Sequence, residues 1–211
     1  MIRVYMTTII DQAQNFDVLS NRILLNVGLK KEIWRSMSKD IALESVCGIL
    51  LLQEAMKRNG LTPNSCIYTS EISGRPYLLN QNIDFSISHS HGTIICAIEA
   101  KKGLHRIGVD VEMYGKRNQT CMKLIANRYF SDNEKRIYQA DPTEKTFMDL
   151  WTAKESLVKM SGKGLEDMLF VDSIDPQSEI STKQFYLDKG VVSLSYHTGS
   201  IPPDKIINVR L

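Results

Sequence analysis

Two carboxylates, Asp110 and Glu112, lie two positions apart in the run 107–112, IGVDVE. Residues two apart on a β-strand share a face, and at about 3.3 Å per residue their Cβ atoms lie roughly 6.6 Å apart. Both carboxylates can therefore reach one hard divalent cation, which prefers oxygen ligands. A half-exposed strand with a solvated acidic face is the usual explanation of a lone D-x-E pair, so a second feature has to decide between these interpretations.

A third carboxylate continues the apolar stripe of a predicted helix. Phe147 and Trp151 are four residues apart, and Glu155 and Lys159 are the next positions on that stripe. Taken alone, the stripe simply ends in solvent, with Lys154 and Lys159 extended toward water. Together with the strand pair, Glu155 can complete an Mg²⁺ site, and the lysines can balance the charge of substrate phosphates.

The run 85–90, FSISHS, alternates serines with Ile87 and His89. His89, Ser88 and the upstream Arg75 can donate hydrogen bonds to a phosphate, although an isolated histidine is more often structural. We exclude a serine hydrolase pair of Ser88 and His89. Adjacent strand residues face opposite ways, and the chain has no G-x-S-x-G motif.

Capping residues and periodicity predict the elements that position these groups. Helices are expected at 40–58, 118–129 and 141–161, the last with Asp141 as its cap and Pro142 at its first position. Strands are expected at the start of the chain and at 84–90, 93–100, 105–113, 168–171, 184–187, 191–196 and 206–209. The runs 93–100 and 105–113 are expected to form a hairpin around Gly103. The order of elements predicts an α+β protein with two similar α/β lobes, residues 1–103 and 104–211.

Composition excludes several classes of function. The chain has 211 residues, 43% of them hydrophobic, and a formal net charge of +2, so no overall field attracts nucleic acid or an anionic membrane. The four cysteines are far apart, which favours buried thiols over a zinc site. The N-terminal residues resemble a strand rather than a signal sequence, and no apolar run is long enough to span a membrane. We expect a soluble cytoplasmic protein.

Three blocks in this order and spacing resemble the signatures of the 4′-phosphopantetheinyl transferase superfamily. They are FSISHS at 85–90, IGVDVE at 107–112 and WTAKESLVKMSGKGL at 151–165, and GRPYL at 74–78 resembles a fourth, weaker block. The length resembles the two-lobed class that acts on carrier proteins of peptide, polyketide and fatty acid synthases. The resemblance implies a monomer of two lobes related by pseudo-two-fold symmetry, with coenzyme A bound between them.

The resemblance implies a reaction and a role for each matched residue. The 4′-phosphopantetheine arm of coenzyme A would be transferred to a serine hydroxyl of an apo acyl or peptidyl carrier protein, with release of 3′,5′-ADP. Asp110, Glu112 and Glu155 would hold Mg²⁺, or Mn²⁺ in its place. Glu155 would be the catalytic base, directly or through a water molecule, or else would only bind the metal ion, and Lys159 would be a second catalytic residue. Coenzyme A would be bound by Arg75, Ser88, His89, Lys154, Lys159 and Lys31.

The chain departs from the family pattern at two places. Family members often carry an arginine three residues after the helix-starting aspartate, but Leu43 occupies that position here. The contact of that arginine with a coenzyme A phosphate is therefore missing or replaced. Ser86 replaces the common asparagine of the FNISHS block and keeps a hydrogen-bonding group. Glu134 matches a further acidic position of the family, or else belongs to a surface helix.

Two other functions fit parts of the pattern. A metal-dependent nuclease or phosphohydrolase would also use D-x-E and a Lys-Glu pair, but it needs a broad basic surface that a net charge of +2 does not favour. A non-catalytic module that binds coenzyme A or a carrier protein would retain the fold without turnover. All three carboxylates are present, so the sequence shows no decay of the site.

Overall fold

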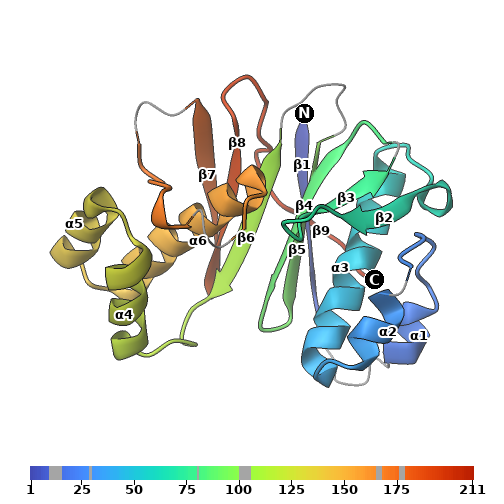
Figure 1. Ribbon diagram of the computed structural model, residues 1–211, viewed down its shortest axis with the longest axis horizontal. Coiled ribbons are helices and arrows are strands. Elements are labelled where there is room, and N and C mark those ends of the chain that lie inside the picture. The colour runs from blue at the N-terminus through green and yellow to red at the C-terminus, as the bar shows by residue number, and fades with distance from the viewer. Residues whose placement is uncertain (10–15, 29, 80, 100–105, 165–167, 176–178) are drawn as a thin grey trace.

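The structure of the chain is a computed structural model that describes residues 1–9, 16–28, 30–79, 81–99, 106–164, 168–175 and 179–211. It is a mixed α/β protein in which helices flank three β-sheets (Figure 1). The helices are α1 (Phe16–Ser20), α2 (Lys30–Arg35), α3 (Lys39–Arg58), η1 (Pro63–Ser65), α4 (Gln119–Tyr129), α5 (Asp132–Ala140) and α6 (Glu144–Ser161). The strands are β1 (Ile2–Thr8), β2 (Ile67–Ser70), β3 (Pro76–Leu79), β4 (Asp84–Ser90), β5 (Thr93–Glu99), β6 (Ile107–Met113), β7 (Ile180–Leu187), β8 (Gly190–His197) and β9 (Ile207–Asn208). The predicted mixture of helices and sheets is confirmed, while the pseudo-two-fold relation stays a prediction.

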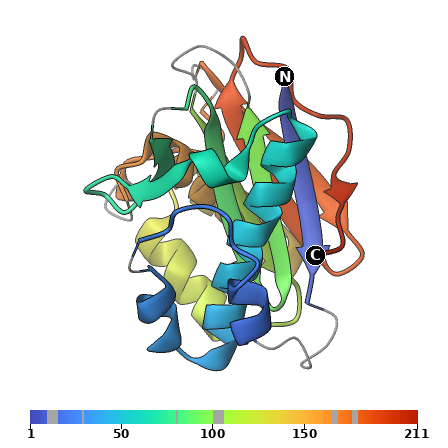
Figure 2. The ribbon, with the colours of Figure 1, turned by 90° about the vertical axis from the view of Figure 1, so that its right-hand side faces the viewer.

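The first sheet has the strand order β4-β5-β1-β9, and all seven residues of β5 are buried. Ile94, Cys96 and Ile98 of β5 pack into a core with α3. Ile95 and Ala97 face the other way and share a core with apolar residues of β6 and β8. Figure 2 shows α3 running along this sheet, with α1 and α2 near one end of it. A strand buried on both faces explains the continuous apolar run in the sequence.

The predicted hairpin between 93–100 and 105–113 is wrong. β5 pairs antiparallel with β4 along one edge and with β1 along the other. Both edges of β5 are therefore occupied, and β6 instead begins a second sheet of order β6-β8-β7. The expected turn at Gly103 and the expected lobe boundary lie outside the described residues. The short strand β9, which comes after that boundary, pairs with β1 in the first sheet.

Helix α6 packs against the second sheet at Gly108 of β6. A Cβ atom at this glycine would lie 1.9 Å from the Ser156 carbonyl oxygen and 2.6 Å from the Met160 nitrogen. Buried hydroxyls also join the helix to β8, since Ser156 Oγ lies 2.7 Å from Ser195 Oγ. The backbone of α6 can therefore approach β6 closely only because residue 108 has no side chain.

Several element boundaries differ from expectation. α6 begins at Glu144 with Thr143 as its N-cap, not at Asp141, because the Thr143 side chain accepts the hydrogen bond from the backbone amide of residue 146. The expected strand at 168–171 is a helical turn followed by a loop. α5 was not predicted, although Ser131 and Glu134 form the capping box that begins it. α1 and α2 were not predicted either.

Three of the four cysteines, Cys47, Cys66 and Cys96, are buried as expected, whereas Cys121 is exposed on α4. Burial raises the pKa of the Cys47 thiol to about 11. No helix in the described ranges is long and apolar enough to cross a membrane.

Candidate functional site

The two main sheets meet where β4 runs beside β6, and side chains rather than a backbone ladder join the strands there. The Ser86 hydroxyl accepts a hydrogen bond from a β6 backbone amide at 3.0 Å. Ser88 Oγ donates to Asp110 Oδ1 at 2.7 Å, and Ser90 Oγ donates to Glu112 Oε2 at 3.0 Å. The serines predicted to share one face of a strand therefore all face β6, and the hydroxyl of Ser86 is used as a hydrogen-bond acceptor there.

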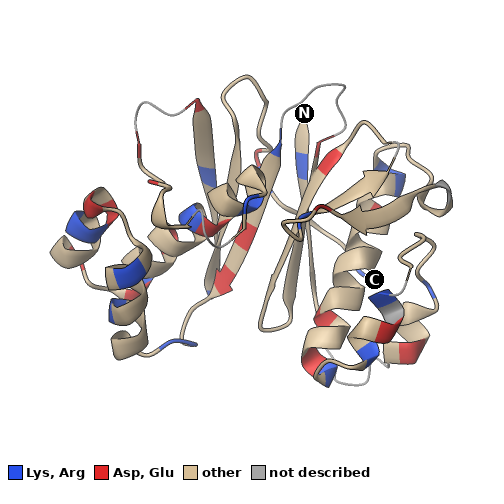
Figure 3. Ribbon diagram, viewed as in Figure 1, with Lys and Arg blue, Asp and Glu red and all other residues tan. Residues whose placement is uncertain are grey.

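Asp110 is 2% exposed, so the solvated acidic face considered from the sequence is wrong for this residue. Lys159 of α6 places its Nζ 2.6 Å from Asp110 Oδ1 and 2.7 Å from Ser88 Oγ. The second carboxylate oxygen, Oδ2, is buried and has no hydrogen-bond partner in the described part of the chain. A buried carboxylate oxygen without a donor is costly, so Oδ2 leaves a place for a further hydrogen-bond donor or for a cation. Figure 3 shows acidic positions along β6 beside basic positions on α6.

Glu155 lies close enough to Asp110 and Lys159 for their charges to change the pKa of its carboxyl. Burial raises the pKa of its carboxyl well above the usual value, the charge of Asp110 raises it further, and Lys159 opposes both effects. Burial lowers the pKa of the Lys159 ammonium, but the charges of Asp110 and Glu155 outweigh burial and leave it raised. The three predicted residues are therefore brought together at the packing of α6 on β6.

Glu112 is held from two sides. Ser90 contacts one carboxylate oxygen, and the guanidinium of Arg117 forms an ion pair with the other. The Arg117 guanidinium also lies 5.6 Å from the centre of the Trp151 ring, within cation–π range. Sequence reasoning missed Arg117. The sequence did contain one indication of this contact. Arg117 follows Glu112 by only five residues, just beyond the turn at Gly115, so its side chain can fold back toward Glu112.

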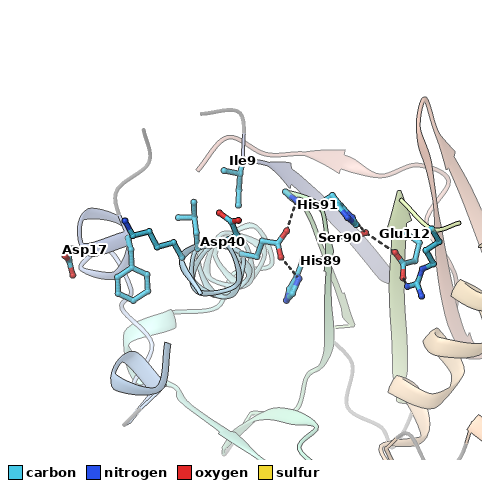
Figure 4. A pocket seen from close by; sticks show the side chains of 13 residues that line it. Ile9, Asp17, Asp40, His89, Ser90, His91 and Glu112 are labelled. Atoms are coloured by element: carbon cyan, nitrogen blue, oxygen red, sulfur yellow. Dashed lines mark hydrogen bonds and ion pairs between the residues drawn. The ribbon is translucent and has the colours of Figure 1, made fainter. Parts of the chain in front are cut away.

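A cavity of about 1260 Å³ opens beside Glu112 and Arg117. Its other described lining residues are Ile9, Phe16, Asp17, Lys39, Asp40, Leu43, Glu44, His89, Ser90, His91 and Gly92. Figure 4 shows His89, Ser90 and His91 between Asp40 on α3 and Glu112 on β6. The α3 residues at 40, 43 and 44 have the i, i+3, i+4 spacing of one helix face, so the sequence could have placed them together.

Glu44 anchors the end of β4. One oxygen of its carboxylate lies 2.9 Å from His89 Nδ1, and the other accepts a hydrogen bond from the Gly92 amide at 2.6 Å. The His89 side chain stays 37% exposed and lines the cavity. The predicted phosphate-binding histidine is therefore placed at the cavity wall, held by a residue that sequence reasoning missed.

Arg75 is placed elsewhere. It is 8% exposed, and its Nη2 lies 2.8 and 2.7 Å from the two carboxylate oxygens of Asp84. It also donates to the backbone carbonyls of Ile107 and Lys159. It lines a separate, smaller cavity of about 260 Å³ together with Lys159. These contacts tie β4 to β6 and α6, which is a structural role.

The structure does not bring Lys154 to the large cavity. Its side chain is 0% exposed, and its Nζ donates to Glu134 Oε2 at 2.9 Å and to the Val171 carbonyl oxygen. Glu134 is also 0% exposed, so its interpretation as a surface-helix residue is wrong. Lys31 lies on α2, and its side chain falls outside the described residues.

No three His, Cys, Asp or Glu side chains in the described ranges are arranged to enclose a metal ion. The donor chemistry of Asp110, Glu112 and Glu155 nevertheless fits a hard divalent cation, because all three offer carboxylate oxygens. Burial is the main cause of the raised pKa of the Glu155 carboxyl, and the negative charge of Asp110 adds to it, while Asp110 Oδ2 has no hydrogen-bond partner among the described residues. In this structure, Lys159 and Arg117 neutralise part of the negative charge of Asp110 and Glu112.

Residues 106–204, which include β6 and α6, match the family model of the 4′-phosphopantetheinyl transferase superfamily. A 4′-phosphopantetheinyl transferase of Bacillus subtilis is 35% identical over 136 residues, 62% of this chain and 57% of that protein. The 4′-phosphopantetheinyl transferase gsp of Aneurinibacillus migulanus is 31% identical over a segment that covers 59% of this chain and 50% of that protein. The 4′-phosphopantetheinyl transferase Sfp of Bacillus subtilis strain 168 is 28% identical over a segment that covers 77% of this chain and 70% of that protein. The chain thus spans little more than half the length of the first two relatives.

Proposed function

We propose that this chain transfers the 4′-phosphopantetheine group of coenzyme A to a serine hydroxyl of an apo acyl or peptidyl carrier protein, because residues 106–204 match the model of the 4′-phosphopantetheinyl transferase superfamily and the relatives described above carry that name. The contact of Asp110 with Lys159, beside the perturbed carboxyl of Glu155, is the observation that supports this most directly. All three residues lie inside the matched segment. We expect a monomer, since one chain supplies both β6 and α6.

In the proposed reaction, the serine oxygen of the carrier forms a bond to the pyrophosphate phosphorus that bears the pantetheine arm. The bond from that phosphorus to the bridging oxygen breaks, and 3′,5′-ADP leaves with the electron pair. The serine proton goes to Glu155, whose pKa is raised by burial, so that its carboxylate is a stronger base than that of an ordinary glutamate. Lys159 lies beside this carboxyl and balances negative charge that develops on the leaving phosphate.

Asp110, Glu112 and Glu155 would hold Mg²⁺, and Mn²⁺ fits the same oxygen ligands. When bound, the metal ion neutralises pyrophosphate charge and orients the phosphates for in-line attack. Ser88 and Ser90 already fix two of these carboxylates by hydrogen bonds. Partners of this kind orient metal ligands and raise metal affinity.

The large cavity has room for coenzyme A, since its volume exceeds that of ordinary small-molecule pockets. Its described walls carry four carboxylates, from Asp17, Asp40, Glu44 and Glu112, against the cations of Lys39 and Arg117. This charge balance is unfavourable for a polyanionic ligand. We therefore expect weak coenzyme A binding without a divalent cation, with His89 and Lys39 nearest to the phosphates and Lys31 as a further candidate.

The test is intact mass spectrometry of a panel of apo carrier proteins after incubation with the protein, coenzyme A and Mg²⁺. A gain of one phosphopantetheine on any carrier, abolished by EDTA, is the expected result. Asp110→Asn and Glu155→Gln should lose the gain, while Glu54→Gln, which alters a surface ion pair with Arg58, should keep it. Coenzyme A binding without any transfer would instead favour a binding module. Cleavage of phosphodiesters without transfer would favour the hydrolase.

A further inference from the structure

The turn between β4 and β5 holds a histidine in an unfavourable backbone conformation. His91 and Gly92 form a two-residue loop between the paired residues Ser90 and Thr93. Their φ angles are +49° and +79°, and His91 is the non-glycine residue with positive φ in the described part of the chain. Asn-Gly is the favoured sequence for such a hairpin loop, because asparagine and glycine tolerate positive φ best. Histidine, like asparagine and aspartate, is found at positive φ more often than other non-glycine residues, so the loop accommodates His91 at a modest cost in stability.

The surrounding structure imposes this conformation. The Gly92 amide donates to Glu44 of α3 at 2.6 Å, and the Gly92 carbonyl accepts from the Ile9 amide at 2.8 Å. The loop is therefore fixed to a helix on one side and to the end of β1 on the other. His91 lines the large cavity, with its ring next to Ser90.

The hydrogen bonds of Ser90 determine the tautomer of His91. The Ser90 hydroxyl has a single proton, and it donates that proton to Glu112 Oε2 at 3.0 Å. Ser90 Oγ also lies 3.0 Å from His91 Nδ1, and toward this nitrogen it can only accept. His91 Nδ1 must therefore carry a hydrogen. The same hydrogen is present on a protonated ring, so the contact does not depend on the charge of His91.

We propose that His91 is a positioning residue that directs the Ser90 hydroxyl toward Glu112. The ordered chain runs from His91 Nδ1–H to Ser90 Oγ and from the Ser90 hydroxyl to the carboxylate, while Arg117 holds the other oxygen of Glu112 (Figure 4). Without the histidine, the Glu112 carboxylate is the one remaining restraint on the direction of the Ser90 hydroxyl among these contacts, so the orientation of Glu112 depends more on Arg117. The effect on turnover rests on the proposed function, whereas the hydrogen-bond chain itself does not.

Two substitutions distinguish the effect of the His91 imidazole from the effect of the positive φ angle of the backbone. His91→Gly and His91→Asn both suit a positive φ, so neither should destabilise the hairpin. Asparagine places an amide N–H about where His91 carries Nδ1–H, and glycine offers no donor. We expect His91→Gly to weaken Mn²⁺ binding, measured by calorimetry on the protein alone, by about three- to tenfold and to lower kcat by a similar factor. His91→Asn should restore both, and the KM for coenzyme A should change little in either variant.

The tautomer has a direct readout that needs no activity. Long-range ¹H–¹⁵N correlation on histidine-labelled protein at alkaline pH, where imidazoles are neutral, distinguishes Nδ1–H from Nε2–H rings. The His91→Asn spectrum identifies the His91 signals by their loss. We expect Nδ1–H in the wild type and a change toward Nε2–H in Ser90→Ala.

The outcomes distinguish the positioning role from the proposed function. An Nε2–H ring in the wild type overturns the positioning role, and so does wild-type Mn²⁺ affinity in His91→Gly. If the wild type transfers nothing to any carrier and yet shows the Nδ1–H ring and the Mn²⁺ loss in His91→Gly, the proposed transferase activity fails and the positioning role stands.

Discussion

The buried ion pair of Lys154 and Glu134 leads to a prediction that separates a structural from a ligand-binding role. Lys154→Met keeps the length of the side chain and removes its charge, leaving Glu134 buried. Loss of one partner of a buried pair typically costs about 3–5 kcal/mol. Glu134 keeps hydrogen bonds from the Ser131 amide at 2.7 Å and from the Ser173 amide and hydroxyl at 2.9 and 2.6 Å. Because these donors still solvate the carboxylate, we expect the lower end, about 3 kcal/mol.

Thermal and urea unfolding followed by circular dichroism would measure this loss. For a chain of this length, about 3 kcal/mol corresponds to a decrease in Tm of roughly 6–12 °C. The matched control is Lys145→Met on the same helix, whose side chain is 61% exposed and pairs with Asp149. It should cost less than about 1 kcal/mol. Lys154→Met combined with Glu134→Gln should recover part of the loss, because no unpaired charge stays buried.

The same variants test whether Lys154 contacts coenzyme A. Folded Lys154→Met, assayed well below its Tm, should keep the wild-type KM for coenzyme A. A raised KM together with an unchanged Tm would refute the structural role and return Lys154 to the binding site, as the sequence resemblance implied.

Three further predictions address the packing, the cavity and the acidic cluster. Gly108→Ala should lower the free energy of unfolding by about 3 kcal/mol or more in urea titrations, because the new Cβ meets the Ser156 carbonyl oxygen; a stable variant would show that α6 can shift. Leu43→Arg adds a cation to the cavity wall and should lower the coenzyme A dissociation constant in calorimetry, whereas Leu43→Gln should not. Glu155 has a pKa raised by burial, so the unfolded chain ionises first and stability falls as pH rises above about 4.5. Glu155→Gln should therefore be more stable than wild type at pH 7.5, and this gain should vanish near pH 4.5; a constant difference would contradict the raised pKa.

The residues of the acidic cluster could be predicted from the sequence because their positions follow from periodicity. The D-x-E pair shares one face of a strand, the serines of 85–90 share a face of another, and Glu155 and Lys159 are one helical turn apart. Which residues share a face within one strand or one helix does not depend on how the elements are arranged in space. The structure adds the burial of Asp110 and its contact with Lys159.

The structure places Lys154 away from the large cavity, where the motif resemblance had implied a contact with coenzyme A. Neighbouring residues on an α-helix point about 100° apart, so Lys154 and Glu155 cannot both face one cavity closely. The helical spacing already placed Lys154 off the stripe of Trp151 and Glu155. Its actual partner, Glu134, lies 20 residues away on α5, a helix that sequence analysis did not predict. The burial of this pair depends on how α5 packs, which no local pattern reveals.

The junction of β4 and β6 was beyond sequence prediction for a physical reason. Strands in one sheet are joined by backbone groups that every residue carries, whereas these two are joined by the hydroxyls of Ser86 and Ser88 and by the carboxylate of Asp84, which accepts from the Ile107 amide at 2.7 Å. Two of the hydrogen bonds that cross this junction, those of Ser88 and Ser90, end on the carboxylates of Asp110 and Glu112. The residues that hold the sheets together are thus the same ones that orient Asp110 and Glu112. Substitution of a β4 serine should therefore lower stability and metal affinity together, whereas His91→Gly, beyond the last paired serine, should lower metal affinity and kcat without lowering stability.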